Sequence, residues 1–177
     1  MLSPLTWTLN GQAVPAVDDP QRMLLDYLRH TAGLKATRLG CGLGQCGACR
    51  VLVDGHAVPA CDTPLWSVAG KSVTTLEGLG TQQVPHPLQT AFIEAQALQC
   101  GFCTSGMIMS AAALLQRKAC PSRAEIQEAL DGNLCRCGVH NRVLQAVASA
   151  AQAMAEPNGC LRAHGSLPEP ESKGAGV

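Results

Sequence analysis

The sequence has few aromatic side chains and no excess charge of either sign. Phe, Trp and Tyr make up 3% of its 177 residues, and 13 Lys and Arg balance 13 Asp and Glu. A chain without net charge does not attract polyanions, and the sequence contains no basic cluster with interleaved aromatic residues. Nucleic-acid binding is therefore excluded. Because large rings supply little of the core, we expect bound inorganic clusters to contribute to stability.

Long apolar runs and a targeting signal are also missing. The longest apolar stretch, around Met107 to Leu115, falls far short of the roughly 20 residues that span a bilayer, so we expect no direct membrane insertion. The first 25 residues lack a basic start followed by an apolar block, so we expect no signal peptide. These features predict a cytoplasmic protein. The alternative is a periplasmic or membrane-associated location reached through a partner that carries the signal.

Motifs for substrate chemistry are absent as well. The sequence contains no P-loop, no G-x-G-x-x-G after a predicted strand, and no serine, histidine and acid constellation. Its five histidines are scattered without the paired spacing of a metal site or a nucleophile. We therefore expect no catalytic residue in this chain.

Cysteine, in contrast, is abundant, and four of the ten cysteines lie in the stretch CGLGQCGACRVLVDGHAVPAC at 41–61. Without a secretion signal, metal binding explains them better than disulfides do. Cys41, Cys46 and Cys49 have the C-x4-C-x2-C spacing of plant-type [2Fe–2S] ferredoxins, and Cys61 supplies a fourth thiolate. A backbone that wraps closely around a cluster and donates N–H groups to its sulfides needs small residues. Four glycines supply them: Gly40, Gly42, Gly44 and Gly47.

A second set of four cysteines lies in the other half of the chain. Cys100 and Cys103 are separated by two residues, and Cys135 and Cys137 by one. Both pairs stand at the ends of predicted helices, so four more thiolates can converge on a second cluster. A structural zinc site also takes four thiolates and is the alternative for this set. For the glycine-rich loop we disfavour zinc, because zinc knuckles do not need four glycines.

The hydrophobic pattern predicts an α+β unit over residues 1–78. Asx-Gly dipeptides at 10–11 and 54–55 predict two β-hairpins, since they supply the positive φ angles of two-residue turns. Residues 21–30 have an apolar face at helical spacing, and residues 71–76 are typical of a strand.

Beyond this unit the apolar residues recur at helical spacing. A Gly- and Pro-containing linker at 79–87 precedes an Ala-, Leu- and Gln-rich region, 88–156, that fits four helices. Ser122 and Glu125 have the spacing of a capping box, which predicts the start of the third helix. The remaining residues, 157–177, are rich in Pro, Gly and Ser and are expected to form a flexible tail.

Four motifs, in this order, resemble one family: GCGLGQCGACRVLVDG, TTLEGL, QCGFCTSGMIM and NLCRCG. The family is the [2Fe–2S] small subunit of the molybdenum hydroxylases, the xanthine dehydrogenase and aldehyde oxidoreductase group. The resemblance covers residues 1 to about 155. The ending CRCGVH is most similar to bacterial isoquinoline oxidoreductase and nicotinate dehydrogenase small subunits, although many relatives have Thr where this chain has Gly138. The resemblance implies a β-grasp, plant-ferredoxin-like domain followed by a four-helix [2Fe–2S]-binding domain.

The resemblance also implies a function in electron transfer. In that family a large subunit binds molybdopterin and hydroxylates an N-heteroaromatic or aldehyde substrate. Electrons then pass through the two [2Fe–2S] clusters to a flavin subunit or a c-type cytochrome. Gln99 and Cys137 match positions that contact the pterin of the molybdenum cofactor, here expected in its cytosine dinucleotide form and held mainly by the large subunit. A stand-alone ferredoxin or redox-sensing iron–sulfur protein is the alternative.

Two further expectations concern residues outside the ligand sets. Cys120 and Cys160 match no ligand position and are expected to be free thiols. Phe102, Met107 and Ile108 are expected to lie exposed on the partner-facing surface of the helical domain.

Overall fold

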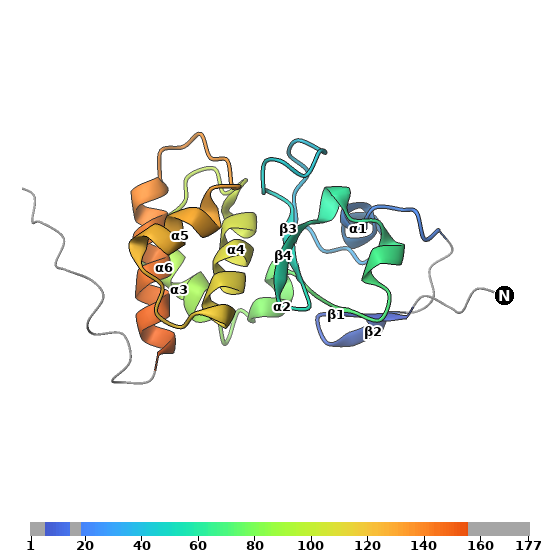
Figure 1. Cartoon of the computed structure of the whole chain (residues 1–177), viewed down its shortest axis with the longest axis horizontal. Coiled ribbons are helices and arrows are strands. Elements are labelled where there is room, and N and C mark those ends of the chain that lie inside the picture. Colours follow the sequence, from blue (N-terminus) through green and yellow to red (C-terminus); the bar gives the residue numbers. More distant parts are fainter. Residues whose placement is uncertain (1–5, 15–18, 156–177) are drawn as a thin grey trace, which may run out of the picture.

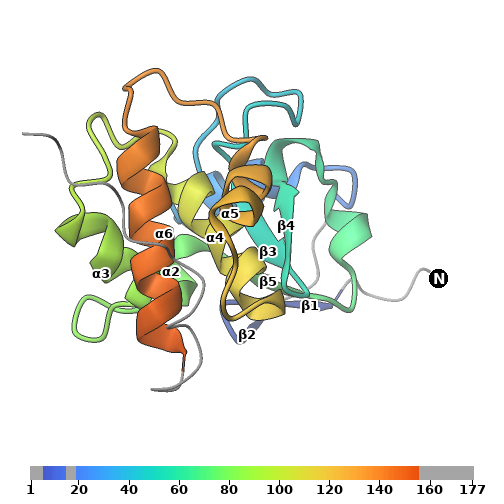
Figure 2. The same cartoon turned by 60° about the vertical axis from the view of Figure 1, so that its left-hand side comes forward.

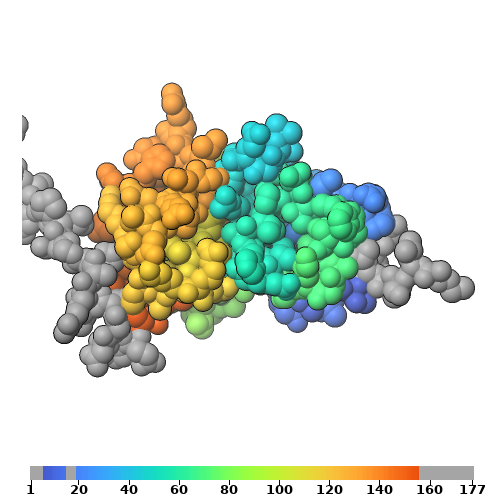
Figure 3. Space-filling view, viewed as in Figure 1, coloured from blue at the N-terminus to red at the C-terminus, as the bar shows by residue number. Residues whose placement is uncertain are grey.

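The chain folds into two units that pack side by side, a sheet with short helical turns and a group of helices (Figure 1). The computed structural model describes residues 6–14 and 19–155. Figure 3 shows the side chains of the two units in contact along their shared boundary. The predicted α+β class is confirmed, whereas the tail predicted at 157–177 lies outside the described residues.

A mixed sheet of five strands forms the first unit, in the order β2-β1-β5-β3-β4. Strands β1 (Trp7–Leu9) and β2 (Gln12–Val14) form an antiparallel hairpin, and β1 pairs in parallel with β5 (Ser72–Thr74). On the other side, β5 pairs with β3 (Arg50–Val53), which forms the second hairpin with β4 (His56–Pro59). The sheet thus joins the first hairpin of the chain to the hairpin that follows the glycine-rich loop.

Both predicted hairpin turns are present. Asn10 and Gly11 have φ values of 51° and 80°, and Asp54 and Gly55 have φ values of 48° and 79°. Positive φ at both central residues is the geometry of the two-residue turn whose twist matches that of the strands. The turn at Asp54 fixes the register of β3 and β4.

The helix predicted at 21–30 is shorter and less regular than expected. It consists of α1 (Leu24–Asp26) and a π-helical turn η1 (Tyr27–Thr31), which bury Leu24 and Leu28 completely. Tyr27 packs edge-on against Trp7 with ring centroids 5.4 Å apart. Edge-on aromatic packing of this kind adds to the stability that comes from burial alone.

The second unit contains the four predicted helices, α3 (Pro87–Glu94), α4 (Thr104–Arg117), α5 (Arg123–Leu130) and α6 (His140–Met154). A short helix, α2 (Leu76–Leu79), leads into them from β5. The predicted capping box is confirmed, since Ser122 accepts a hydrogen bond from the Glu125 N–H and the Glu125 side chain accepts one from the Ser122 N–H. Within the described part of the chain, no helix combines the length and the apolar character needed to cross a bilayer.

Helix α4 is the centre of the molecule, because it packs against β3 and β4 on one side and against α3 and α5 on the other (Figure 2). The expectation that Met107 and Ile108 are exposed is wrong, since both lie in this buried helix at 2% and 4% exposure. Phe102, just before the helix, is 45% exposed, as expected.

The two units approach each other closely at Gly106 of α4. A Cβ placed on Gly106 would lie 2.0 Å from the carbonyl oxygen of Gly47, in the glycine-rich loop. No side chain fits between the helix and the loop at this point. The two units therefore meet backbone to backbone beside the first group of cysteines.

We predict that Gly106→Ala lowers the stability of the protein. In an unconstrained helix this change would stabilise by about 0.5–1 kcal/mol. Here the added methyl group collides with the Gly47 carbonyl, and overpacking of this kind typically costs about 1–3 kcal/mol. Thermal unfolding followed by circular dichroism should show a lower Tm than the wild type, and an unchanged or higher Tm would contradict the backbone contact.

Candidate metal centres

The β3–β4 hairpin brings the last of the first four cysteines back to the other three. Cys49 directly precedes β3, and Cys61 lies in the 3-10 turn η2 (Ala60–Asp62) that directly follows β4. Arg50 is paired with Pro59, and the Ala60 N–H donates to the Cys49 carbonyl oxygen over 3.2 Å. The hairpin register therefore places Cys61 beside Cys49, although 11 residues separate them in the sequence.

Backbone N–H groups of the glycine-rich loop point at the cysteine sulfurs. Three of them, from Leu43, Gln45 and Cys46, lie 3.3–3.4 Å from Cys41 Sγ. These hydrogen bonds, with that from Leu43 the strongest, lower the pKa of the Cys41 thiol to about 6. Cys41 is thus held in the thiolate form that binds metal.

Two further N–H groups complete this pattern. The Cys41 N–H lies 3.3 Å from Cys46 Sγ, and the Gly44 N–H lies 3.3 Å from Cys61 Sγ. Donation of N–H groups to ligand sulfur is one of the means by which a protein tunes an iron–sulfur cluster. The loop supplies it with main-chain groups alone, and donation to the sulfides of a bound cluster stays a prediction.

The thiols of this site are arranged as two pairs. Cys41 contacts Cys46, and Cys49 contacts Cys61, while Cys46 is also near enough to Cys49 to interact with it electrostatically. Burial raises the pKa of the Cys49 thiol to about 12, because Cys49 is only 1% exposed and an anion there is poorly solvated. A thiolate in that position needs the positive charge of a metal beside it.

The second set of cysteines comes from two loops of the helical unit. Cys100 and Cys103 lie between α3 and α4, with Cys103 at the N-cap of α4, and Cys135 and Cys137 lie between α5 and α6. Cys137 Sγ is 3.5 Å from Cys100 Sγ, and Cys103 contacts Cys135. Burial raises the pKa of the Cys103 thiol to about 12. This set also forms two pairs.

The paired arrangement fits [2Fe–2S] clusters better than zinc. Such a cluster has four cysteine ligands shared between two irons, so each iron takes one pair. A structural zinc ion needs its four ligands around a single centre at about 2.3 Å from each sulfur.

The predictions for the remaining named residues have different outcomes. Gln99 is exposed next to Cys100, and its pterin contact stays a prediction. Cys120 is disulfide-bonded in the structure, so the expectation of a free thiol there is wrong. Cys160 lies outside the described residues.

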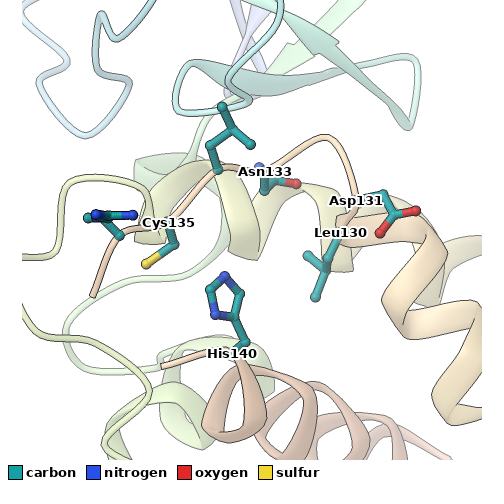
Figure 4. Close-up of a pocket in the computed structure, with 7 residues that line it drawn as sticks. Leu130, Asp131, Asn133, Cys135 and His140 are labelled. Carbon is teal, nitrogen blue, oxygen red and sulfur yellow. The ribbon is translucent and has the colours of Figure 1, made fainter. Parts of the chain in front are cut away.

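A hollow of about 510 Å³ adjoins the second set of cysteines (Figure 4). The side chains of Cys135 and His140 point into the same space, which Asn133 and Asp131 also border. Sequence reasoning did not identify Asn133, because an Asn two residues before a cysteine gives no signal of its own.

Comparisons with known proteins agree with this architecture. Residues 7–74 match the family described as "2Fe-2S iron-sulfur cluster binding domain", and residues 75–148 match the "[2Fe-2S] binding domain" family. One of the subunits of nicotinate dehydrogenase from Pseudomonas putida is 48% identical over 157 residues, covering 89% of this chain and all of that protein. The alpha subunit of isoquinoline 1-oxidoreductase from Brevundimonas diminuta is 50% identical over 149 residues, covering 84% of this chain and 97% of that protein.

The chain belongs to the [2Fe–2S] small-subunit family of the molybdenum hydroxylases. Solved structures of this group have the same fold. The aldehyde oxidoreductase from Desulfovibrio desulfuricans superposes with a TM-score of 0.82 at 42% identity, covering 86% of this chain and 17% of that much longer chain. A chain of quinoline 2-oxidoreductase from Pseudomonas putida superposes with a TM-score of 0.79 at 38% identity and is covered over 95% of its length. The chain is therefore part of an oxidoreductase that binds [2Fe–2S] clusters. The predicted family and the predicted fold are confirmed.

We predict that the purified protein contains about four irons and four acid-labile sulfides per chain, as two [2Fe–2S] clusters require. Cys49→Ser and Cys103→Ser should each lower the content to about two irons, because each removes a ligand of a different site. Metal and sulfide analysis measures this directly. Cys120→Ser, a cysteine substitution outside both sets, is the control and should keep about four irons. About two zinc ions per chain without sulfide would contradict the assignment.

Proposed function

We propose that this chain is the electron-transfer subunit of a molybdenum hydroxylase, with one [2Fe–2S] cluster at each cysteine site. The first site consists of Cys41, Cys46, Cys49 and Cys61, and the second of Cys100, Cys103, Cys135 and Cys137. When bound, each cluster accepts and releases one electron at a time. The observation that carries the proposal is the two-pair arrangement of thiols at both sites, joined to the membership of the chain in this family.

A hydrogen bond between two backbone groups connects the two sites. The N–H of Leu134, the residue before Cys135, donates to the carbonyl oxygen of Cys46 over 3.0 Å. The glycine-rich loop and the two interhelical loops that carry cysteines lie on the same edge of the molecule in both views (Figures 1 and 2). This proximity supports a relay between the sites with no other chain between them.

We infer that a large molybdopterin-binding subunit covers the second site. Leu98, Phe102 and Leu134 are exposed beside its cysteines, and an exposed apolar group of this kind is typical of a surface that a partner buries. Gln99 and Cys137 then contact the pterin of the molybdenum cofactor, in its cytosine dinucleotide form. The relatives, named as subunits of larger dehydrogenases and oxidoreductases, support this assembly.

The acceptor is assigned to the first site. Cys41 is exposed there, and Leu39 and Leu43 project from the same loop at 56% and 68% exposure. A flavin subunit or a c-type cytochrome would dock on this loop. For the substrate we propose an N-heteroaromatic ring, since the relatives described above are named for nicotinate and isoquinoline, with an aldehyde as the second candidate. The proposed location is the cytoplasm, or the periplasm or a membrane surface through a partner.

The order of the two sites can be tested by ligand substitution in the complete enzyme. Cys61→Ser disturbs the site assigned to the acceptor, so substrate should still reduce the second cluster while turnover with the natural acceptor collapses. Cys137→Ser disturbs the site beside the pterin, so reduction of the first cluster by substrate should fail. Stopped-flow reduction by substrate followed by EPR of each cluster separates these cases. If Cys61→Ser blocked reduction of the second cluster while Cys137→Ser left the first cluster reducible, the proposed order would be reversed.

Gln99→Ala should have a milder effect than Cys137→Ser. It removes about one neutral hydrogen bond, worth about 0.5–1.5 kcal/mol, and leaves all cysteine ligands in place. Intramolecular reduction of the second cluster should slow modestly while the iron content stays at the wild-type value. A loss of cluster in Gln99→Ala would show instead that Gln99 supports the iron site and would contradict the assigned pterin contact.

A further inference from the structure

The segment from Cys46 to Cys49 connects the two thiol pairs of the first site. Cys46 belongs to the pair with Cys41, and Cys49 belongs to the pair with Cys61. The path of this segment therefore sets how far apart the two pairs lie. Both carbonyl groups at its start are held from outside the first unit, by donors of the helical unit.

Asn133 provides one of these donors. Its Nδ2 donates to the Gly47 carbonyl oxygen over 3.1 Å, and its backbone N–H donates to the Leu130 carbonyl oxygen over 2.8 Å, so it is tied to both units. The Gly47 oxygen also accepts the Arg50 N–H at 3.3 Å. Asn133 is 5% exposed, and a buried amide of this kind is costly unless it is hydrogen-bonded. The neighbouring Leu134 N–H holds the Cys46 carbonyl, as described above.

The Asn133 side chain is itself oriented by a buried hydroxyl. Ser110 Oγ, on α4, lies 2.8 Å from Asn133 Oδ1, to which it can donate, and it accepts a hydrogen bond from Arg50 Nη1 over 3.1 Å. Arg50 lies on β3, directly after Cys49. The single Ser110 proton can be donated to Asn133 Oδ1 or to the Gly106 carbonyl oxygen at 3.0 Å, so Ser110 supports the Asn133 amide, which presents its N–H to Gly47.

The packing leaves the segment little freedom. A Cβ on Gly47 would lie 2.3 Å from the Gly132 carbonyl oxygen and 2.5 Å from Asn133 Nδ2. Because each peptide group is rigid, holding the carbonyls of Cys46 and Gly47 also fixes the two peptide planes that lead toward Cys49. The helical unit therefore controls the backbone between two ligands of the other unit.

We propose that Asn133 is a positioning residue for the first cluster, although it lies two residues from a cysteine of the second. The inference rests on the proposed cluster ligands and adds to them a role for the Asn133 side chain. By anchoring Gly47, Asn133 keeps the thiol pairs at the spacing of one cluster and keeps the loop N–H groups directed at the sulfurs. Such N–H groups stabilise the more negative reduced state, so loosening them lowers the reduction potential.

The test is a redox titration of the complete enzyme, followed by EPR of both clusters, with Asn133→Ala and Asn133→Asp. The Asp variant keeps an oxygen facing Ser110 and lacks the N–H that faces Gly47. We expect both variants to shift the midpoint potential of the first cluster downward, and a selective loss of the first-site iron would support the same role. Ser110→Ala leaves the bond from Asn133 to Gly47 in place and should give a smaller shift in the same direction. Cys49→Ser and Cys103→Ser assign the two EPR signals.

Asn141→Ala is the matched control, because Asn141 is an exposed asparagine of the same unit that accepts a hydrogen bond from Arg123 over 3.2 Å. It should leave both potentials unchanged. The proposal is overturned if Asn133→Ala keeps its iron with an unshifted first signal, or if its effect is confined to the second cluster or spread equally over both. Failure of the underlying cluster assignment would be seen separately, as zinc or a single cluster in the wild-type enzyme.

Discussion

The arrangement of the molecule depends on the direct contact between the Gly47 carbonyl and helix α4 at Gly106. A side chain at either glycine would separate the two units and, with them, the two cysteine sites. The buried hydrogen bonds of Asn133 and Ser110 lie around this point and connect the sheet, the central helix and the loop before Cys135. Backbone contact is thus the constraint from which the spacing of the sites follows.

The sheet serves the first site in a simple way. The turn at Asp54 and Gly55 sets the register of β3 and β4, and that register returns Cys61 to Cys49. The glycine-rich loop then supplies N–H groups to the sulfurs, which favour charge on the thiolates and on any cluster they hold. In the helical unit the four cysteines lie on two interhelical loops, which the packing of the helices brings together.

Much of this could be predicted from the sequence, because its strongest signals are local. Asx-Gly turns, the capping box at Ser122 and the spacing of the cysteines each depend on a few neighbouring residues, and the turns and the cap are confirmed. The failures concern contacts between distant segments. Met107 and Ile108 are buried because α4 is packed between the sheet and the other helices. The disulfide bond of Cys120 has no sequence signal, and Asn133 acquires its role only when Gly47 is brought beside it across 86 residues.

The central claim is that each set of four cysteines holds a pair of irons. Mössbauer spectroscopy of the ⁵⁷Fe-enriched enzyme tests it most directly, because the method reports the valence and coupling of every iron. The account predicts that all iron in the oxidised protein belongs to coupled ferric pairs with a diamagnetic ground state, and that full reduction gives ferrous and ferric iron in equal amounts at both sites. Isolated ferric or ferrous ions, or the averaged valences of a four-iron cluster, would contradict it.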